Sequence, residues 1–170
     1  MFAAECGLLG WVAFVAAGQT LQQLTFGHRT RKAALEALGG NPVRSDPPDA
    51  FSRTLLARLE AYAAGEPIDF QDIAVDMDDL SPFRCRVVQC CRQIAYGETL
   101  TYGQLASLAG SPGAARAVGN CMAANRTPLV VPCHRVVPAD GRVGAFSASG
   151  GAATKRRLLR LEGATNGRAG

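Results

Sequence analysis

The first third of the chain spaces hydrophobic and polar residues in two ways, one typical of strands and one typical of helices. Alternation with a period of two breaks at a turn and then resumes, which is the pattern of a β-hairpin. Apolar residues next recur every three or four positions, as on one face of a helix. The pattern predicts strands at residues 10–16 and 21–26, a turn at 17–20, and helices at 29–38 and 50–63. This part of the chain is therefore predicted to be a small α/β unit.

An acidic segment at residues 68–80 interrupts that pattern. It carries five aspartates and is closed by Ser81-Pro82. A further loop, rich in proline and aspartate, is predicted at residues 42–48. We place the domain boundary in the acidic segment. The predicted division is an N-terminal domain at 1–79, a second domain at 80–165 and a tail at 166–170.

The second half of the chain is predicted to be mainly helical. A helix at residues 82–94 comes first, and five of its residues have the spacing of a core face. These are Phe83, Val87, Cys90, Cys91 and Ile94. Cys90 and Cys91 are thus expected to have an ordinary packing role.

Two further helices have the pattern of a helix-turn-helix. Thr101 lies three residues before Gln104, which is the spacing of a capping box and predicts a short helix to Leu108. Ser111-Pro112 is typical of another helix start, with serine as the cap and proline in the first turn. A second helix is therefore predicted at residues 112–124, and helix, short turn and helix is the arrangement of that motif.

The second of these helices carries almost no long side chains. It consists largely of alanine and glycine, and Arg116 is its one long residue. A helix that reads the major groove needs long polar side chains, whereas a smooth helix suits close approach to the narrow minor groove. We interpret the helix as a minor-groove element that inserts Arg116. The alternative of an alanine-rich core helix stays open.

The stretch at residues 129–137 contains the candidate nucleophile. An apolar run is predicted to be a strand that Pro132 ends, which leaves Cys133 at the mouth of that strand. A free thiol with a pKa near 8.5 needs a base at neutral pH, and His134 is the nearest candidate. Adjacent residues of an extended segment point to opposite faces, so we expect a water relay between the two. The alternative is a buried structural cysteine.

The last two predicted elements are a loop and a helix. Residues 141–151 are rich in glycine and serine, which is typical of a loop that lets a ligand approach backbone amides, or of a plain linker. A helix at residues 154–161 is predicted to turn leucines inward and basic residues outward. Glu162 follows at its C-terminal end, where an anionic side chain opposes the helix dipole by roughly 0.3–1 kcal/mol. That placement suggests a functional role for Glu162.

Composition and charge restrict the classes of function. The 170 residues carry a net charge of +4, too small for a general polyanion binder, so a basic surface would depend on placement. Six cysteines and two histidines include no CxxC pair, which argues against a metal site and favours a reducing cytoplasm. The apolar start lacks a positive n-region, and no run is long enough to span a membrane. We expect a soluble cytoplasmic protein without a signal peptide or a membrane contact.

Several motifs in the second half resemble the O6-alkylguanine-DNA alkyltransferases, which move an alkyl group from damaged guanine onto their own cysteine. The similarity covers residues 81–163. It rests on Pro132-Cys133-His134-Arg135-Val136-Val137, Tyr96-Gly97-Glu98-Thr99, the run at 101–106 and the run at 114–119. The resemblance implies an α+β chain, with a small ribonuclease-H-like α/β domain before a mainly helical winged helix-turn-helix domain.

The resemblance also implies a role for each matching residue. A catalytic relay is implied in which Glu162, His134 and water deprotonate Cys133, while Asn125 shapes the neighbouring turn. DNA contacts are implied for Tyr102, Ala115, Arg116 and Gly119, with Arg116 filling the stack and Tyr102 helping to swing the nucleotide out. Substrate contacts are implied for Met122, Val136, Ser147 and Ser149. Which of the two serines lies nearer the guanine oxygen stays open, because the chain is two residues longer around Ala148-Ser149.

The predicted reaction is a direct, stoichiometric transfer of an alkyl group from O6-alkylguanine in duplex DNA to Cys133. O4-alkylthymine is a second candidate substrate, and we expect a monomer that needs no cofactor and no obligatory protein partner. Two other classes stay open: a lesion-recognition protein that binds without repair, and a cysteine hydrolase that uses Cys133 and His134. The chain departs from the family pattern at Val88, Ala95, Arg126 and Phe146.

Overall fold

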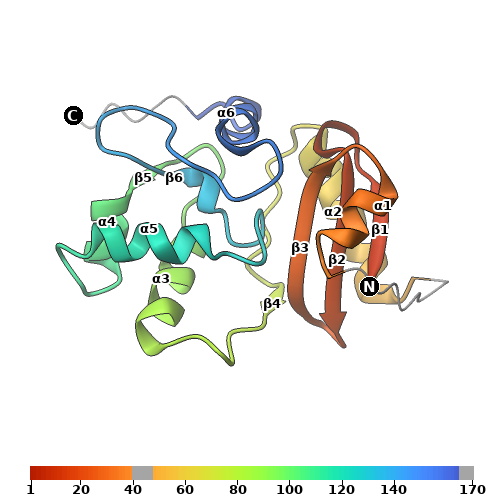
Figure 1. The fold of residues 1–170 in the computed structure, drawn as a ribbon, viewed down its shortest axis with the longest axis horizontal. Helices are drawn as coiled ribbons and strands as arrows, with labels where there is room; N and C mark the ends of the chain where they lie inside the picture. Colours follow the sequence, from red (N-terminus) through yellow and green to blue (C-terminus); the bar gives the residue numbers. More distant parts are fainter. Residues whose placement is uncertain (40–47, 165–170) are drawn as a thin grey trace. The chain divides into compact units, whose positions relative to one another are not determined.

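The computed structural model describes residues 1–39 and 48–164. Most of the predicted loop at 42–48 and the predicted tail at 166–170 lie outside the described residues. The chain divides into two compact units, Met1–Asp76 and the remainder from Met77 onward (Figure 1). Both contain helices and strands, so the predicted α+β class is confirmed. Among the described residues, no helix is long and apolar enough to cross a membrane.

The first unit is built on a four-stranded sheet with the order β1-β2-β3-β4. The antiparallel pair of β2 and β3 confirms the predicted hairpin, β1 pairs antiparallel with β2, and β4 pairs parallel with β3. The strands are β1 (Phe2–Glu5), β2 (Trp11–Ala17), β3 (Thr20–His28) and β4 (Ala74–Val75). The sequence pattern did not predict β1 or β4, because four residues and two residues are too few to show a period.

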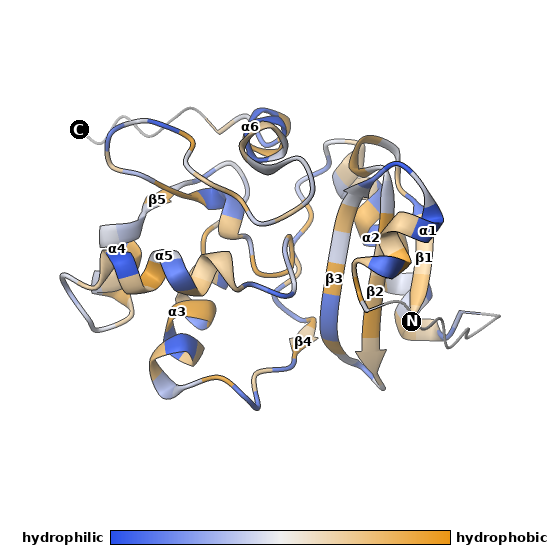
Figure 2. Cartoon of the chain, in the orientation of Figure 1, coloured by the Kyte–Doolittle hydropathy of each residue, from blue (hydrophilic) through white to orange (hydrophobic). Residues whose placement is uncertain are grey.

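An irregularity in the hairpin explains why its alternation is imperfect. Leu21, Leu24 and Phe26 are all buried, although strict alternation would send Leu21 and Leu24 to opposite faces. Figure 2 shows both hydrophobic and hydrophilic positions along β3. The register shifts where the pairs Val15–Gln23 and Ala16–Leu21 meet. One extra residue in a bulged strand restores the inward direction of the next side chain, so all three residues can join the core.

Two α-helices and the short 3-10 helix η1 (Gly7–Leu9) complete the described part of the first unit. α1 (Arg31–Glu36) begins at Thr30, whose hydroxyl accepts a hydrogen bond from the Ala33 N–H at 3.1 Å, and it packs on the sheet. It is shorter at both ends than the helix predicted at 29–38. α2 (Ala50–Ala63) confirms the predicted helix and begins at Asp49, whose carboxylate accepts from the Ser52 N–H at 2.7 Å.

The second unit contains the helix-turn-helix. The regular elements are α3 (Pro82–Arg92), β5 (Leu100–Thr101), α4 (Tyr102–Leu108), α5 (Ala115–Ala123), η2 (Cys133–Arg135), β6 (Val136–Val137) and α6 (Gly151–Leu161). α3, α4 and α5 pack against one another, and β5 pairs parallel with β6 (Figure 1). The predicted capping box is confirmed, because Thr101 and Gln104 exchange hydrogen bonds of 2.7 and 3.1 Å. On α3, Val87 and Cys91 are buried as predicted, whereas Phe83 and Cys90 are only half-buried.

The start of α5 differs from the prediction. Ser111 does not cap it, and the helix begins three residues after Pro112. Gly113 has a φ of +89°, which is the left-handed region and cannot belong to a right-handed helix. Residues 111–114 instead form a turn, closed by a bond from the Ala114 N–H to the Ser111 carbonyl. The connection between α4 and α5 is therefore longer than the sequence suggested.

The predicted strand before Pro132 is wrong. Residues 129–131 form a buried turn in which Leu129 has a φ of +74°. The Val131 N–H donates to the Thr127 carbonyl, and the Val131 carbonyl accepts from the side-chain amide of Asn125. These local bonds satisfy the backbone N–H and carbonyl of Val131 without a neighbouring strand. Cys133 lies in the 3-10 helix η2 rather than at the end of an extended segment.

Candidate active site

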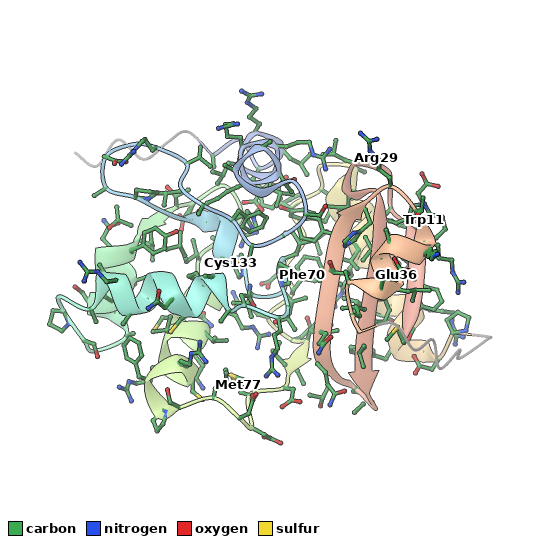
Figure 3. All side chains as sticks on the ribbon, in the orientation of Figure 1. Trp11, Arg29, Glu36, Phe70, Met77 and Cys133 are labelled. Atoms are coloured by element: carbon green, nitrogen blue, oxygen red, sulfur yellow. The ribbon has the colours of Figure 1, made fainter. Side chains whose placement is uncertain are left out.

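Cys133 is buried, and its thiol is held by a side-chain amide. The residue is 3% exposed and begins η2 (Figure 3). The Asn125 Nδ2 donates to the Cys133 Sγ at 3.0 Å and also to the Val131 carbonyl at 2.9 Å. The Asn125 Oδ1 accepts from the Thr127 N–H at 3.1 Å, which fixes the orientation of the amide. Asn125 thereby ties the turn at 125–131 to the sulfur.

The surroundings of Cys133 determine how readily its thiol loses a proton. Burial raises the pKa of Cys133, while the hydrogen bond from Asn125 and the positive charge of Lys155 lower it. Burial is the largest of these effects, so the thiol is protonated at neutral pH. A thiolate is the reactive form, and the site therefore needs a proton acceptor.

His134 and Glu162 form a buried pair beside the cysteine. The His134 Nε2 lies 2.8 Å from the Glu162 Oε1, and both side chains have no exposed surface. The Glu162 Oε2 also accepts from the Gly97 N–H at 3.3 Å. Glu162 caps the C-terminal end of α6, so the folding of that helix brings the carboxylate to η2. The structure thus brings Glu162 to His134, the residue that follows Cys133, and it places Asn125 on the Cys133 sulfur.

Arg135 is a further member of this network, which the sequence analysis named only as part of the motif around Cys133. Its Nε and Nη2 donate to the two oxygens of Glu162 at 2.9 and 3.0 Å. Its Nη1 donates to the Ile94 carbonyl at 2.6 Å, and its guanidinium lies 5.9 Å from the centre of the Tyr96 ring. A bidentate contact of this kind fixes the plane of the carboxylate and keeps it ionised. Arg135 therefore orients Glu162 toward His134.

The pKa values of the pair reflect burial and the charges nearby. Burial acts to raise the pKa of Glu162, but hydrogen bonds and charge from His134 and Arg135 outweigh it and bring this pKa down to about 2. Burial lowers the pKa of His134, and Glu162 partly opposes that effect. At neutral pH the histidine is thus a neutral base beside an ionised carboxylate.

We expect this pair to make the protein sensitive to acid. A carboxyl whose pKa falls from 4.5 to about 2 on folding contributes about 3 kcal/mol, present above pH 4.5 and lost as the pH falls toward 2. His134 acts in the same direction below pH 6.5, because the unfolded histidine binds a proton that the buried one resists. Denaturant unfolding followed by circular dichroism at pH 7 to 3 should show this loss.

Glu162→Gln is the variant that isolates this effect, and the exposed Glu98→Gln is its matched control. The Glu162 variant should start at a lower free energy of unfolding, because it leaves the Arg135 charge without its partner. Its stability should then fall less between pH 4.5 and 3 than that of the wild type. A slope equal to the wild-type slope would contradict the assignment.

A cavity of about 180 Å³ opens beside the sulfur. Its lining comes from α4, α5, η2 and the loop before α6. The lining residues are Tyr102, Gly119, Met122, Ala123, Cys133, Ala145, Phe146 and Ser147. The Phe146 ring meets the His134 ring edge-on, with centroids 6.5 Å apart. Tyr102 and Met122 therefore line the same cavity as Cys133.

The remaining predicted residues lie around this cavity. Ser147 lines it, whereas the Ser149 carbonyl accepts a 2.6 Å hydrogen bond from Thr154 at the start of α6. Val136 follows η2 and is buried. Arg116 is exposed on α5 and Ala115 is half-buried beside it. Gly119 faces Tyr102, since a Cβ there would lie 4.0 Å from the ring.

Lys155 corrects the prediction that the basic residues of the last helix point outward. It is fully buried on α6, and its Nζ donates to the Val136 carbonyl at 2.6 Å. Burial lowers its pKa to about 8, which the nearby Cys133 and Cys91 partly oppose. Arg156, Arg157 and Arg160 do point outward. Within the described part of the chain, no cluster of three or more metal-binding side chains was found.

The fold and the site define a helix-turn-helix protein with a buried thiol beside a histidine–glutamate pair, and comparisons with known proteins place it in a family. Residues 82–164 match the model of the 6-O-methylguanine DNA methyltransferase DNA-binding domain. The methylated-DNA–protein-cysteine methyltransferase of Mycobacterium tuberculosis is 44% identical over 115 residues, which are 68% of this chain and 67% of that protein. A DNA base-flipping protein of Thermus thermophilus is 46% identical over 116 residues, 68% of this chain and 76% of that one.

Solved structures agree with these relatives. The crystal structure of Mycobacterium tuberculosis OGT in complex with DNA has a TM-score of 0.73 and 36% sequence identity. The match covers 94% of this chain and 90% of that one. The chain belongs to the methylated-DNA–protein-cysteine methyltransferase family, as the resemblance of its motifs implied.

Proposed function

We propose that this protein repairs DNA by transferring a methyl or larger alkyl group from the O6 atom of guanine to Cys133. The observation that carries the proposal is the position of this buried thiol, which lines a cavity beside α5 of the helix-turn-helix. The names of the relatives support the reaction, since the Mycobacterium tuberculosis protein is a methylated-DNA–protein-cysteine methyltransferase. Such a protein acts once, because the acceptor is part of its own chain.

The first chemical step is loss of the thiol proton from Cys133. We propose that the proton passes through water to His134, whose imidazolium is stabilised by Glu162. The thiolate then attacks the alkyl carbon in line with the C–O6 bond. The C–S bond forms as the C–O6 bond breaks, and the electron pair stays on O6. Guanine takes up the proton that left the sulfur, and a thioether remains on the protein.

The partner of this reaction is duplex DNA that contains the lesion. We infer that α5 approaches the minor groove, because its small residues allow close contact and its one long side chain, Arg116, is exposed. A base inside a duplex must be extruded before it can enter a pocket. Tyr102, Met122 and Ser147 line the cavity and are proposed to contact the extruded guanine, together with Val136.

Stoichiometry tests the proposal. Wild-type protein is incubated with duplex DNA that carries O6-methylguanine, and intact mass is measured at increasing ratios of DNA to protein. The protein should gain one methyl group per chain and then stop. A lesion-recognition protein would bind the DNA without a change in mass, and a hydrolase would release methanol over many turnovers. Either result would overturn the proposal.

The relay makes a separate prediction for Glu162. Replacing it with glutamine removes the charge that stabilises the imidazolium, so transfer should slow by about a hundredfold or more. DNA binding should be almost intact, because Glu162 lies in the buried network and not on the exposed face of α5. Single-turnover transfer and gel-shift affinity would be measured on the same preparation. Transfer at the native rate, or a collapse of DNA affinity, would argue against the relay.

A further inference from the structure

One buried charge has no place in the relay, and it lies next to a tyrosine that lines the cavity. Lys155 has no exposed surface, although a lysine is rarely buried unless it is paired. Its Nζ donates to the Val136 carbonyl at 2.6 Å and lies 5.8 Å from the centre of the Tyr102 ring. Tyr102 in turn lines the cavity together with Cys133. The ammonium group thus lies between the Val136 carbonyl and the ring of Tyr102, which lines the cavity with Cys133.

We infer that Lys155 is a positioning residue whose ammonium group stabilises the Cys133 thiolate during transfer. The inference rests on the proposed function for its purpose, but the electrostatic effect concerns the cysteine alone. An ammonium group in a site closed to water acts on a nearby anion more strongly than it would in solvent. The hydrogen bond to the Val136 carbonyl leaves Lys155 no freedom to turn away.

The groups that face Lys155 come from three other elements. Cys133 and His134 belong to η2, Cys91 to α3 and Tyr102 to α4. Burial raises the pKa of both thiols and lowers those of His134 and Lys155. The positive charge of Lys155 acts to lower the pKa of both thiols and of the histidine, and a Cys133 thiolate acts to raise the pKa of Lys155 in return.

The interaction between Lys155 and Cys133 limits the pH range in which the lysine favours the thiolate. Below the Lys155 pKa of about 8 the charge is present and favours the thiolate. Above that pH the lysine loses its proton and the assistance is lost, even as the thiol itself ionises more readily. Burial lowers the pKa of His134, and the charge of Lys155 adds to that effect, which favours the neutral form that accepts a proton. One side chain thereby favours both the nucleophile and its base.

The test measures the Cys133 thiolate directly and needs neither DNA nor a methyl donor. Wild type, Lys155→Met, Lys155→Arg and Arg157→Met are alkylated with iodoacetamide from pH 5 to 10, and peptide mass identifies the label on Cys133. Arg157→Met is the matched control, because Arg157 is exposed on the same helix. Lys155→Met should move the midpoint upward by about one pH unit, so its rate at pH 7 falls about tenfold. Lys155→Arg keeps the positive charge and should react at least as fast as the wild type, and Arg157→Met should follow the wild type.

A Lys155→Met variant that is folded by circular dichroism and keeps the wild-type midpoint would overturn the inference. If this variant fails to fold, the comparison of wild type with Lys155→Arg decides, because arginine keeps its charge above pH 8. The arginine variant should then be alkylated at a lower midpoint than the wild type, and a higher one would overturn the inference. Failure of methyl transfer from DNA leaves this measurement untouched, so the two proposals can fail separately.

Discussion

Replacing Cys133 with serine is expected to abolish methyl transfer while the protein still binds duplex DNA. Serine is close to cysteine in volume and its hydroxyl can still accept the Asn125 hydrogen bond. Its hydroxyl is a far weaker nucleophile than a thiolate, and no base in this site is strong enough to ionise it. The rate should fall by at least about ten-thousandfold, the scale on which enzymes lose activity with their nucleophile. Intact mass after incubation with O6-methylguanine DNA measures the loss.

The matched control is Cys90→Ser, because Cys90 is half-buried on α3 and does not line the cavity. That variant should accept one methyl group per chain, as the wild type does. Gel-shift affinity for the same DNA confirms that Cys133→Ser is folded and reaches the lesion. Methyl transfer by the Cys133→Ser variant, or methyl on another cysteine of the wild type, would show that Cys133 is not the acceptor.

The stretch at residues 129–137 shows how much of the candidate site could be predicted from the sequence alone. The order of Pro132, Cys133 and His134 was enough to indicate a nucleophile, because a thiol beside an imidazole carries recognisable chemistry. The backbone around it was not predictable, since the apolar run at 129–131 reads as a strand. Instead, the Val131 N–H donates to the Thr127 carbonyl, and the Val131 carbonyl accepts from the side chain of Asn125. When a side chain takes the place of a neighbouring strand as the hydrogen-bond partner, the spacing of hydrophobic residues in the sequence does not reveal it.

Lys155 illustrates a second limit. On a helix, the position of a lysine beside two arginines predicts exposure, and Arg156 and Arg157 are exposed. Lys155 is buried because the Val136 carbonyl and the Tyr102 ring meet it from elements far away in the chain. Contacts between elements that are far apart in the chain cannot be read from the sequence of the helix itself. Glu162 was easier to find, since its charge opposes the dipole of α6 and the misplaced charge could be noticed locally.

Replacing Arg116 is expected to slow repair most on paired DNA and least on the free base. Arg116 is the long, exposed residue of a helix made otherwise largely of small ones, and we propose that it fills the space left by the extruded nucleotide. Extrusion from a duplex costs a few kcal/mol, so losing the wedge should slow transfer from duplex DNA by roughly 10- to 100-fold. A single-stranded or mismatched base costs less to extrude, and free O6-benzylguanine needs no extrusion.

The comparison of two substitutions separates shape from charge. Arg116→Ala removes both the planar group and the charge, whereas Arg116→Lys keeps a charge but not the planar guanidinium. Single-turnover rates are measured for both variants on duplex DNA, single-stranded DNA and O6-benzylguanine, with Arg157→Ala as a charge-loss control on α6. If Arg116 acts as a wedge, lysine should recover little of the duplex rate, and neither variant should differ from wild type on the free base. Equal losses on all three substrates would show that Arg116 supports the fold or the pocket. Recovery of the duplex rate by lysine would show that Arg116 contributes its charge, as a phosphate contact does, and not the shape of a wedge.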